Sequence, residues 1–148
     1  MSWLSPNLSQ GEVIRGSGFN EWSEVPIDIR NAVKLTATDM FQPIRKALGK
    51  GISIVSGGGI RSVEMNERCG GSLRSQHLKG FALDLRCKKP ELIVAIYEIC
   101  DELQRNGSIP QGGLALYVRK DGTPRFVHCD RRGRIARWNK SAMSKAVV

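Results

Sequence analysis

The order of apolar patterns in the second half of the chain constrains the fold most. Residues 81–86 alternate apolar and polar side chains, as a half-buried strand does. Residues 90–103 instead carry apolar side chains at helical spacing. Two further apolar segments, 114–118 and 125–130, flank the turn Asp121-Gly122, which predicts a β-hairpin. A strand, a helix and a hairpin in this order predict the α+β class, with helices packed on a small antiparallel sheet.

The first half of the chain predicts a second long helix, a short strand and a short helix. Apolar residues recur at helical spacing over residues 26–48, and a kink or break is expected at Pro43, which lacks a backbone N–H. The apolar run 52–55 predicts a short strand before a glycine turn. Residues 62–68 then fit a short helix.

Length and composition favour a single domain. The chain has 148 residues, of which 41% are hydrophobic, which is enough for a core without a stabilising metal. We expect one domain over residues 1–148. Within it, residues 1–24 are expected to form an irregular amino-terminal arm and residues 139–148 a basic carboxy-terminal tail.

The charge balance predicts an anionic partner. There are 23 Lys and Arg against 14 Asp and Glu, a net charge of +9. Such an excess suits nucleic acid, an anionic membrane surface or an anionic cell wall, and composition alone does not choose among them. No apolar run approaches the roughly 18–20 residues of a membrane span, and the first residues lack the pattern of a signal peptide. We therefore expect a soluble protein made in the cytoplasm.

The four cysteines, Cys69, Cys87, Cys100 and Cys129, form no C-x-x-C pair. Without an export signal we interpret them mainly as reduced thiols. A bridge or a metal role stays open for Cys69 and Cys87.

Three residues together have the character of a metal site. The chain has two histidines, His77 just before the strand at 81–86 and His128 on a later strand, and Asp84 lies on the first of these strands. Two imidazoles, a carboxylate and one open position suit catalytic zinc, which lowers the pKa of a bound water. From spacing alone, ordinary surface or core histidines are the commoner explanation.

The segment around these residues resembles a known family. Ser75, His77, Gly80, Ala82 and Asp84 form an S-x-H-x-x-G-x-A-x-D motif, which resembles that of M15-type zinc D-Ala-D-Ala carboxypeptidases and peptidoglycan endopeptidases. The resemblance covers roughly residues 3–138 and is closest to the small phage-like branch. It implies a hedgehog/DD-peptidase-like fold and a zinc site made by His77 and Asp84 with His128, which stands in the segment Phe-Val-His-Cys-Asp.

The same resemblance implies further site residues. Arg61 matches an arginine that faces the substrate, Ser75 would support a ligand or cap its turn, and Tyr117 would line the cleft or pack. Relatives often carry an acidic residue three positions before the last ligand, where this chain has Arg125. Asp130 follows His128 by two residues on the same face, so it is expected either to activate water or to orient a ligand. Glu64 and Glu67 are weaker candidates for the proton acceptor.

These expectations combine into one function and two alternatives. The first is zinc-dependent hydrolysis of a peptide bond in the stem or cross-link peptide of bacterial peptidoglycan, as a carboxypeptidase or endopeptidase that lyses the anionic cell wall. The protein would act after release, as a phage lysin does, or as part of a virion. One alternative is a non-catalytic zinc-binding module of the same fold. The other, nucleic-acid binding by the basic segment 131–138, is not the expected partner class because a solvated basic face explains such a segment more simply.

Overall fold

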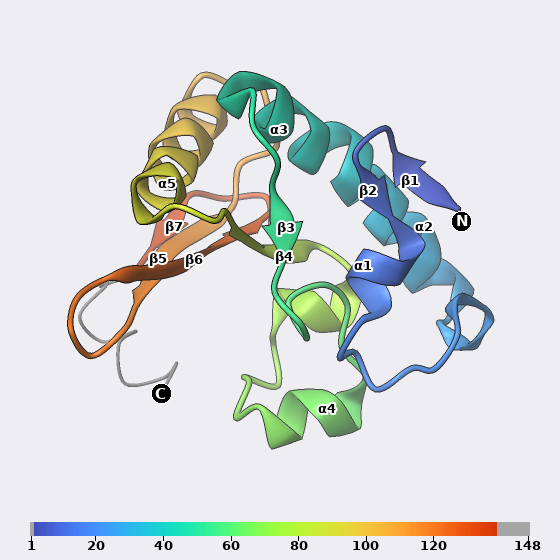
Figure 1. Ribbon diagram of the computed structural model, residues 1–148. Coiled ribbons are helices and arrows are strands. Elements are labelled where there is room, and N and C mark those ends of the chain that lie inside the picture. The colour runs from blue at the N-terminus through green and yellow to red at the C-terminus, as the bar shows by residue number, and fades with distance from the viewer. Residues whose placement is uncertain (1, 139–148) are drawn as a thin grey trace.

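The computed structural model describes residues 2–138, so the predicted basic tail at residues 139–148 lies outside the described part. Helices cover one side of a small twisted sheet, and the amino-terminal segment packs beside the longest helical stretch (Figure 1). The α+β class predicted from the sequence is confirmed.

A five-stranded sheet in the order β3-β4-β6-β5-β7 carries the candidate site. Its strands are β3 (Ser53–Ile54), β4 (Ala82–Arg86), β5 (Gly113–Val118), β6 (Pro124–Asp130) and β7 (Ala136–Arg137). The predicted hairpin is present as β5 and β6, and β4 pairs with β6 on the other side. The three long strands therefore lie side by side, with β6 between β4 and β5.

The expectation of a purely antiparallel sheet was wrong at one edge, because β7 runs parallel to β5. Two residues are too few to produce a periodic signal in the sequence. The strand is held by side-chain contacts instead. The guanidinium of Arg137 donates to the Asp101 carboxylate on the neighbouring helix, 2.9 Å away, and to the Gly112 carbonyl, 3.0 Å away.

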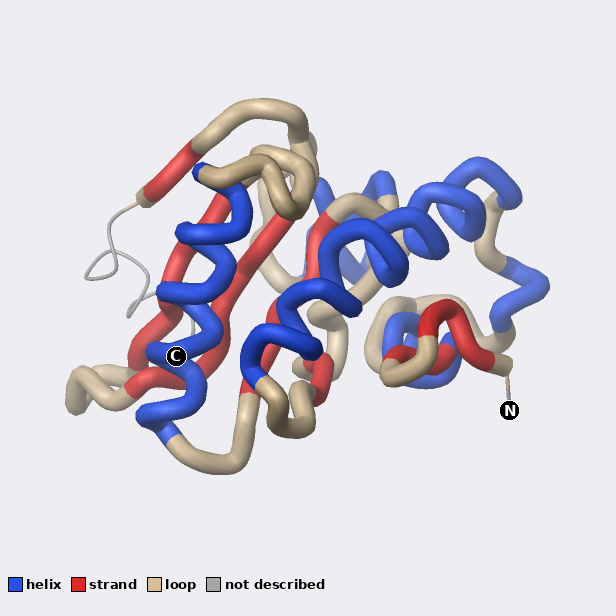
Figure 2. Tube along the Cα trace, turned by 90° about the horizontal axis from the view of Figure 1, so that it is seen from above, coloured by secondary structure: helices blue, strands red, loops and turns tan. Residues whose placement is uncertain are grey.

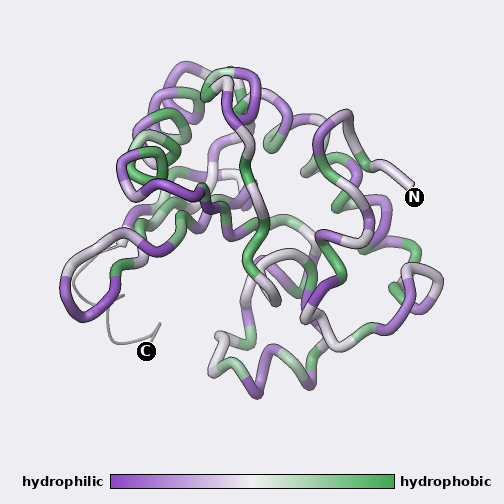
Figure 3. The backbone as a smooth tube through the Cα atoms, viewed as in Figure 1, coloured by the Kyte–Doolittle hydropathy of each residue, from purple (hydrophilic) through white to green (hydrophobic). Residues whose placement is uncertain are grey.

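Helix α5 (Pro90–Arg105) covers the sheet, as its apolar stripe predicts, and extends two residues beyond the predicted end. Ile93, Ile96 and Cys100 are buried on its inner face, and the helix packs against β6, β5 and β4. Figure 2 shows it lying across the strands, and in Figure 3 apolar and polar segments alternate along it. One face is thus committed to the core and the other to solvent.

The predicted helix over residues 26–48 is present without a break. It consists of α2 (Ile27–Thr36), a π-helical turn (Ala37–Phe41) and α3 (Gln42–Leu48). The Gln42 N–H donates to the Ala37 carbonyl five residues back, which makes the turn wider just before Pro43. The expected disturbance at Pro43 thus takes the form of one wide turn, since a π-turn leaves room where a proline ring would crowd the preceding carbonyl.

The expectation of an irregular arm at residues 1–24 was wrong. The segment forms a two-stranded hairpin, β1 (Trp3–Ser5) with β2 (Leu8–Ser9), followed by α1 (Gln10–Ile14) and a 3₁₀ turn (Trp22–Glu24). A capping box between Ser9 and Glu12 starts α1, and Leu8 and Val13 are fully buried. These elements are too short for periodicity to reveal.

The short elements next to the site follow the prediction. Strand β3 falls within the predicted run 52–55, and α4 (Val63–Arg68) begins after Ser62, whose hydroxyl caps it. Of the helices in residues 2–138, none is both long and apolar enough to cross a membrane.

Leu85 on β4 tests the importance of the core under the sheet. Its side chain is fully buried in the hydrophobic cluster, so Leu85→Ala should lower the free energy of unfolding by about 2–5 kcal/mol in urea denaturation. The matched control is Leu73→Ala, because Leu73 is 83% exposed and should change stability by at most about 0.5 kcal/mol. Equal losses in the two variants would contradict the packing described.

Candidate metal centre

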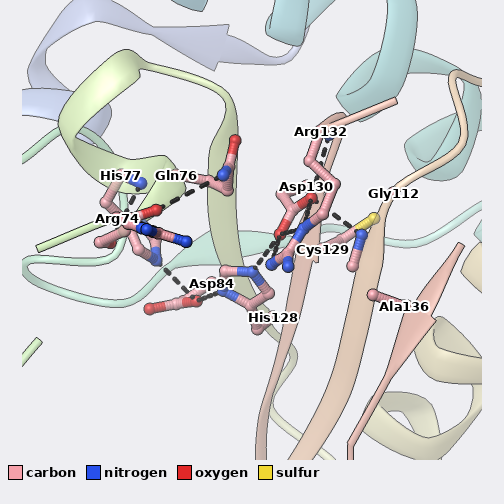
Figure 4. Close-up of polar contacts among 12 residues, drawn as sticks. Arg74, Gln76, His77, Asp84, Gly112, His128, Cys129, Asp130, Arg132 and Ala136 are labelled. Carbon is pink, nitrogen blue, oxygen red and sulfur yellow. Dashed lines mark hydrogen bonds and ion pairs between the residues drawn. The ribbon is translucent and has the colours of Figure 1, made fainter. Parts of the chain in front are cut away.

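His77, Asp84 and His128 come together from three separate elements. His77 lies in the 3₁₀ turn Gln76–Lys79, Asp84 on β4, and His128 on β6 directly opposite Asp84 in the strand register. His77 Nε2 lies 3.3 Å and His128 Nδ1 3.2 Å from Asp84 Oδ1. All three side chains are buried, and one donor atom from each lies within 4.8 Å of the others (Figure 4). The structure thus places the three predicted ligands in one cluster.

The turn that carries His77 is built from two residues of the motif. Ser75 precedes the turn, and its hydroxyl accepts a hydrogen bond from the His77 backbone N–H. Gly80 ends the turn with a positive φ of 77°, a conformation that favours glycine. A side chain at Gly80 would also approach the Ile29 carbonyl of α2 to 3.0 Å. The capping role expected for Ser75 is present, and Gly80 ends the turn tightly.

The outer nitrogen of His77 is fixed by a backbone carbonyl. His77 Nδ1 lies 2.7 Å from the Gly59 carbonyl oxygen, so this nitrogen carries a proton, and in the neutral imidazole the lone pair is on Nε2, which faces Asp84. A Cβ on Gly59 would lie 2.3 Å from the Val13 carbonyl, and one on Gly58 2.7 Å from the Asp84 Cβ. The glycines therefore permit a close approach of β3, α1 and β4, a role that sequence reasoning missed although the unusual run of three glycines signalled it.

Asp130 holds the outer nitrogen of His128. Its Oδ2 lies 2.7 Å from His128 Nε2, and the carboxylate also pairs with the Arg132 guanidinium at 2.7 Å. Oδ1 accepts the Gly113 backbone N–H at 2.8 Å. Asp130 is completely buried, and both of its oxygens are engaged in these contacts.

The electrostatics of the cluster follow from these contacts. Burial alone would lower the pKa of His128, but hydrogen bonds to Asp130 and Asp84 outweigh it and raise that pKa to about 9. Burial alone would raise the pKa of the Asp84 and Asp130 carboxyls. The charge of His77 and the hydrogen bond from His128 instead hold the pKa of Asp84 below its usual range, and His128 and Arg132 do the same for Asp130.

This donor set fits a metal ion. Two imidazole nitrogens and one carboxylate oxygen converge, which is a ligand set of catalytic zinc sites with three protein donors. The outer nitrogen of each imidazole is held by an acceptor, as is usual for metal-binding histidines. Cys69, Cys87, Cys100 and Cys129 are free thiols outside the cluster.

A cavity of about 480 Å³ opens beside the cluster. It is lined by several residues predicted for the site, among them Arg61, Ser75 and Tyr117. Arg61 donates from Nε to the Gly57 carbonyl at 2.7 Å, and its guanidinium lies 3.5 Å from the Asp84 carboxylate. Tyr117 both lines the cavity and stacks on Phe126, with ring centroids 4.5 Å apart, so the two expectations for it hold together.

The cavity lining distinguishes the acid–base candidates by position. Of the described residues that line it, Asp84 alone carries a carboxylate; Asp130, Glu64 and Glu67 are not among them. Trp138, which the sequence analysis considered only as part of the basic segment 131–138, does line the cavity, with its ring centroid 5.2 Å from that of His128. It lies far from the motif in sequence, so only the fold reveals its place.

A protein-family model described as peptidase M15 matches residues 19–130, which includes all three residues of the cluster. The chain belongs to the peptidase M15 family. Members are metallopeptidases, so the family and the His-Asp-His cluster both point to a metal-dependent peptidase. A comparison with curated proteins gave no match.

Asp84 tests whether the cluster holds a metal. Purified protein should contain about one divalent metal ion per chain, and Asp84→Asn should lose it, because an amide donor is neutral and binds transition metals more weakly. The matched control is Asp121→Asn in the exposed β5–β6 turn, which should retain the metal. Elemental analysis after dialysis measures both. Equal metal content in Asp84→Asn and wild type would contradict the assignment.

Proposed function

We propose that this protein is a zinc-dependent peptidase that hydrolyses a peptide bond in the stem or cross-link peptide of bacterial peptidoglycan. The observation that carries the proposal is the buried convergence of His77 Nε2, Asp84 Oδ1 and His128 Nδ1 beside an open cavity. Membership of the peptidase M15 family supports the reaction class.

His77, Asp84 and His128 would hold the zinc ion. When bound, zinc supplies a Lewis acid that polarises a carbonyl and lowers the pKa of water. The protein's part is to keep the two imidazoles in the correct tautomer. The Gly59 carbonyl does this for His77 and the Asp130 carboxylate for His128, because each accepts the proton of the outer nitrogen.

We therefore assign Asp130 to orienting His128 rather than to accepting a proton from water. Its carboxylate is fully buried, is not among the groups that line the cavity and already accepts hydrogen bonds from Gly113 and Arg132. A proton acceptor in catalysis must reach the water or substrate directly. Asp130 acts through His128 and is a positioning residue.

Arg61 is the proposed contact to the substrate. Its Nε is fixed by the Gly57 carbonyl and its Nη1 donates to the Asn66 side chain, so the guanidinium is held at the cavity wall. A fixed guanidinium near the cluster is placed to bind the oxygen on which negative charge develops, or a carboxylate of the peptide.

The peptidoglycan substrate rests on two features of the sequence. One is the resemblance of Ser75–Asp84 to the motif of D-Ala-D-Ala carboxypeptidases and endopeptidases, and the other is the net charge of +9, which suits an anionic cell wall. We propose cell-wall lysis, as a phage lysin or virion-associated enzyme, as the setting of this activity.

A non-catalytic zinc-binding module is the second candidate. It is favoured by one observation: Asp84, itself a proposed ligand, is the sole carboxylate among the described residues that line the cavity. Among the described lining residues, no other carboxylate is then present to accept a proton from the attacking water.

Digestion of purified peptidoglycan separates these two functions. Wild-type protein loaded with zinc should release peptides whose masses identify the cleaved bond, and a chelator or His77→Ala should abolish the release, because the ligand set loses a donor. Asp121→Asn should digest normally. Intact peptidoglycan with zinc bound would favour the binding module.

Asp130→Asn tests the orienting role. Loss of the carboxylate should weaken zinc binding by about 10–100-fold, the usual effect of removing a group that orients a ligand. Competition with a chromogenic chelator measures the affinity. Asp101→Asn, a carboxylate that pairs with arginines on α5 and β7, should leave it unchanged. Unchanged affinity in Asp130→Asn together with lost peptidase activity would mean that Asp130 accepts a proton instead.

A further inference from the structure

The cavity beside the cluster is strongly cationic. Four arginines line it, Arg61, Arg74, Arg125 and Arg132, against the single carboxylate of Asp84 among the described lining residues. Two of these arginines pair with carboxylates of the centre itself: Arg61 lies 3.5 Å from Asp84 and Arg132 lies 2.7 Å from Asp130. Arg74 and Arg125 add charge from other places, the loop before the His77 turn and the start of β6.

A strand irregularity brings Arg125 to the cavity. Tyr117 of β5 pairs with Phe126, but the next residue, Val118, pairs with Pro124, so β6 has one extra residue at Arg125 and the register shifts there. Arg125 stands three residues before His128, and in a regular strand it would point to the opposite face. An extra residue of this kind turns a side chain and is common beside active sites. Both Arg125 and His128 accordingly line the cavity.

The surroundings of Arg125 suit a fixed guanidinium. Its side chain is half-buried, and its guanidinium carbon lies 5.8 Å from the centre of the Phe126 ring. Phe126 in turn stacks on Tyr117, and both rings line the cavity. An arginine over an aromatic ring loses less freedom on binding and presents a planar pair of donors that matches a carboxylate.

We propose that Arg125 binds a free carboxylate of the peptide substrate close to the scissile bond, so that the enzyme selects acidic peptides. This inference rests on the proposed peptidase function and names its substrate class. The carboxylate of the peptide brings negative charge to a cavity whose described lining has four arginines and one carboxylate, and Arg125 is the specificity-determining residue that binds it.

A synthetic peptidoglycan stem pentapeptide tests the inference in three forms: both carboxylates free, the glutamyl carboxylate amidated, and the terminal carboxylate amidated. The zinc-loaded wild type should show a KM at least about tenfold higher for one of the amidated forms, because a charge-assisted hydrogen bond is lost. The affected form identifies the carboxylate.

Arg125→Gln should raise KM for the free peptide by about the same factor and abolish the preference, with kcat little changed. Arg125→Lys should regain part of the preference for the free carboxylate, because lysine restores the positive charge but not the planar pair of donors of arginine. The matched control is Arg105→Gln on α5, whose side chain is 58% exposed and does not line the cavity; it should keep the wild-type preference.

Binding of the same peptides to metal-free protein, measured by calorimetry, separates the two ways of failing. Cleavage of all forms with equal KM, or an unchanged preference in Arg125→Gln, would overturn the inference and leave the peptidase standing. If the wild type cleaves none of the peptides, the proposed function fails for them. Tighter binding of the free peptide, lost in Arg125→Gln, would still support carboxylate recognition, and equal binding would overturn it.

Discussion

The pairing of Asp84 on β4 with His128 on β6 is the constraint on which the rest of the site depends. The two residues lie directly opposite each other in an antiparallel register. Side chains alternate between the faces of a strand, so a slip of one residue would turn either group away from the other. The buried leucines of β4 and the packing of α5 on β6 keep this register, and thus the core holds the candidate metal centre together.

The same centre explains why the amino-terminal segment is ordered. His77 is held by the Gly59 carbonyl, and Gly59 itself packs against the backbone of Val13 in α1. On the other side, His128 is held by Asp130, which is neutralised by Arg132 and the Gly113 N–H. A buried carboxylate is tolerated only when its charge is paired in this way. The two histidines are thus supported by segments that lie far apart in the sequence.

The charge of the cavity connects this centre to the choice of substrate. Asp130 is buried against His128, and among the described lining residues four arginines stand against the one carboxylate of Asp84. The M15 family accounts for the reaction class, and the cationic lining is the basis for the proposed selection of acidic peptides. The two candidate functions differ in one requirement: a peptidase needs a group that accepts the proton of the attacking water, and a zinc-binding module does not.

The sequence by itself determined the α+β class and the main helices and strands, because apolar periodicity is a local signal. It also predicted the grouping of His77 and Asp84 from a compact motif, and of His128 from the resemblance of a second segment. It did not reveal the hairpin and α1 within residues 1–24, the parallel strand β7 or the wide turn before Pro43, since each is short and is stabilised by distant contacts. Nor did it choose between the two roles of Asp130. Tertiary structure alone buried that carboxylate against His128 Nε2 and turned Arg125 into the cavity, because the direction of a side chain depends on strand register and packing.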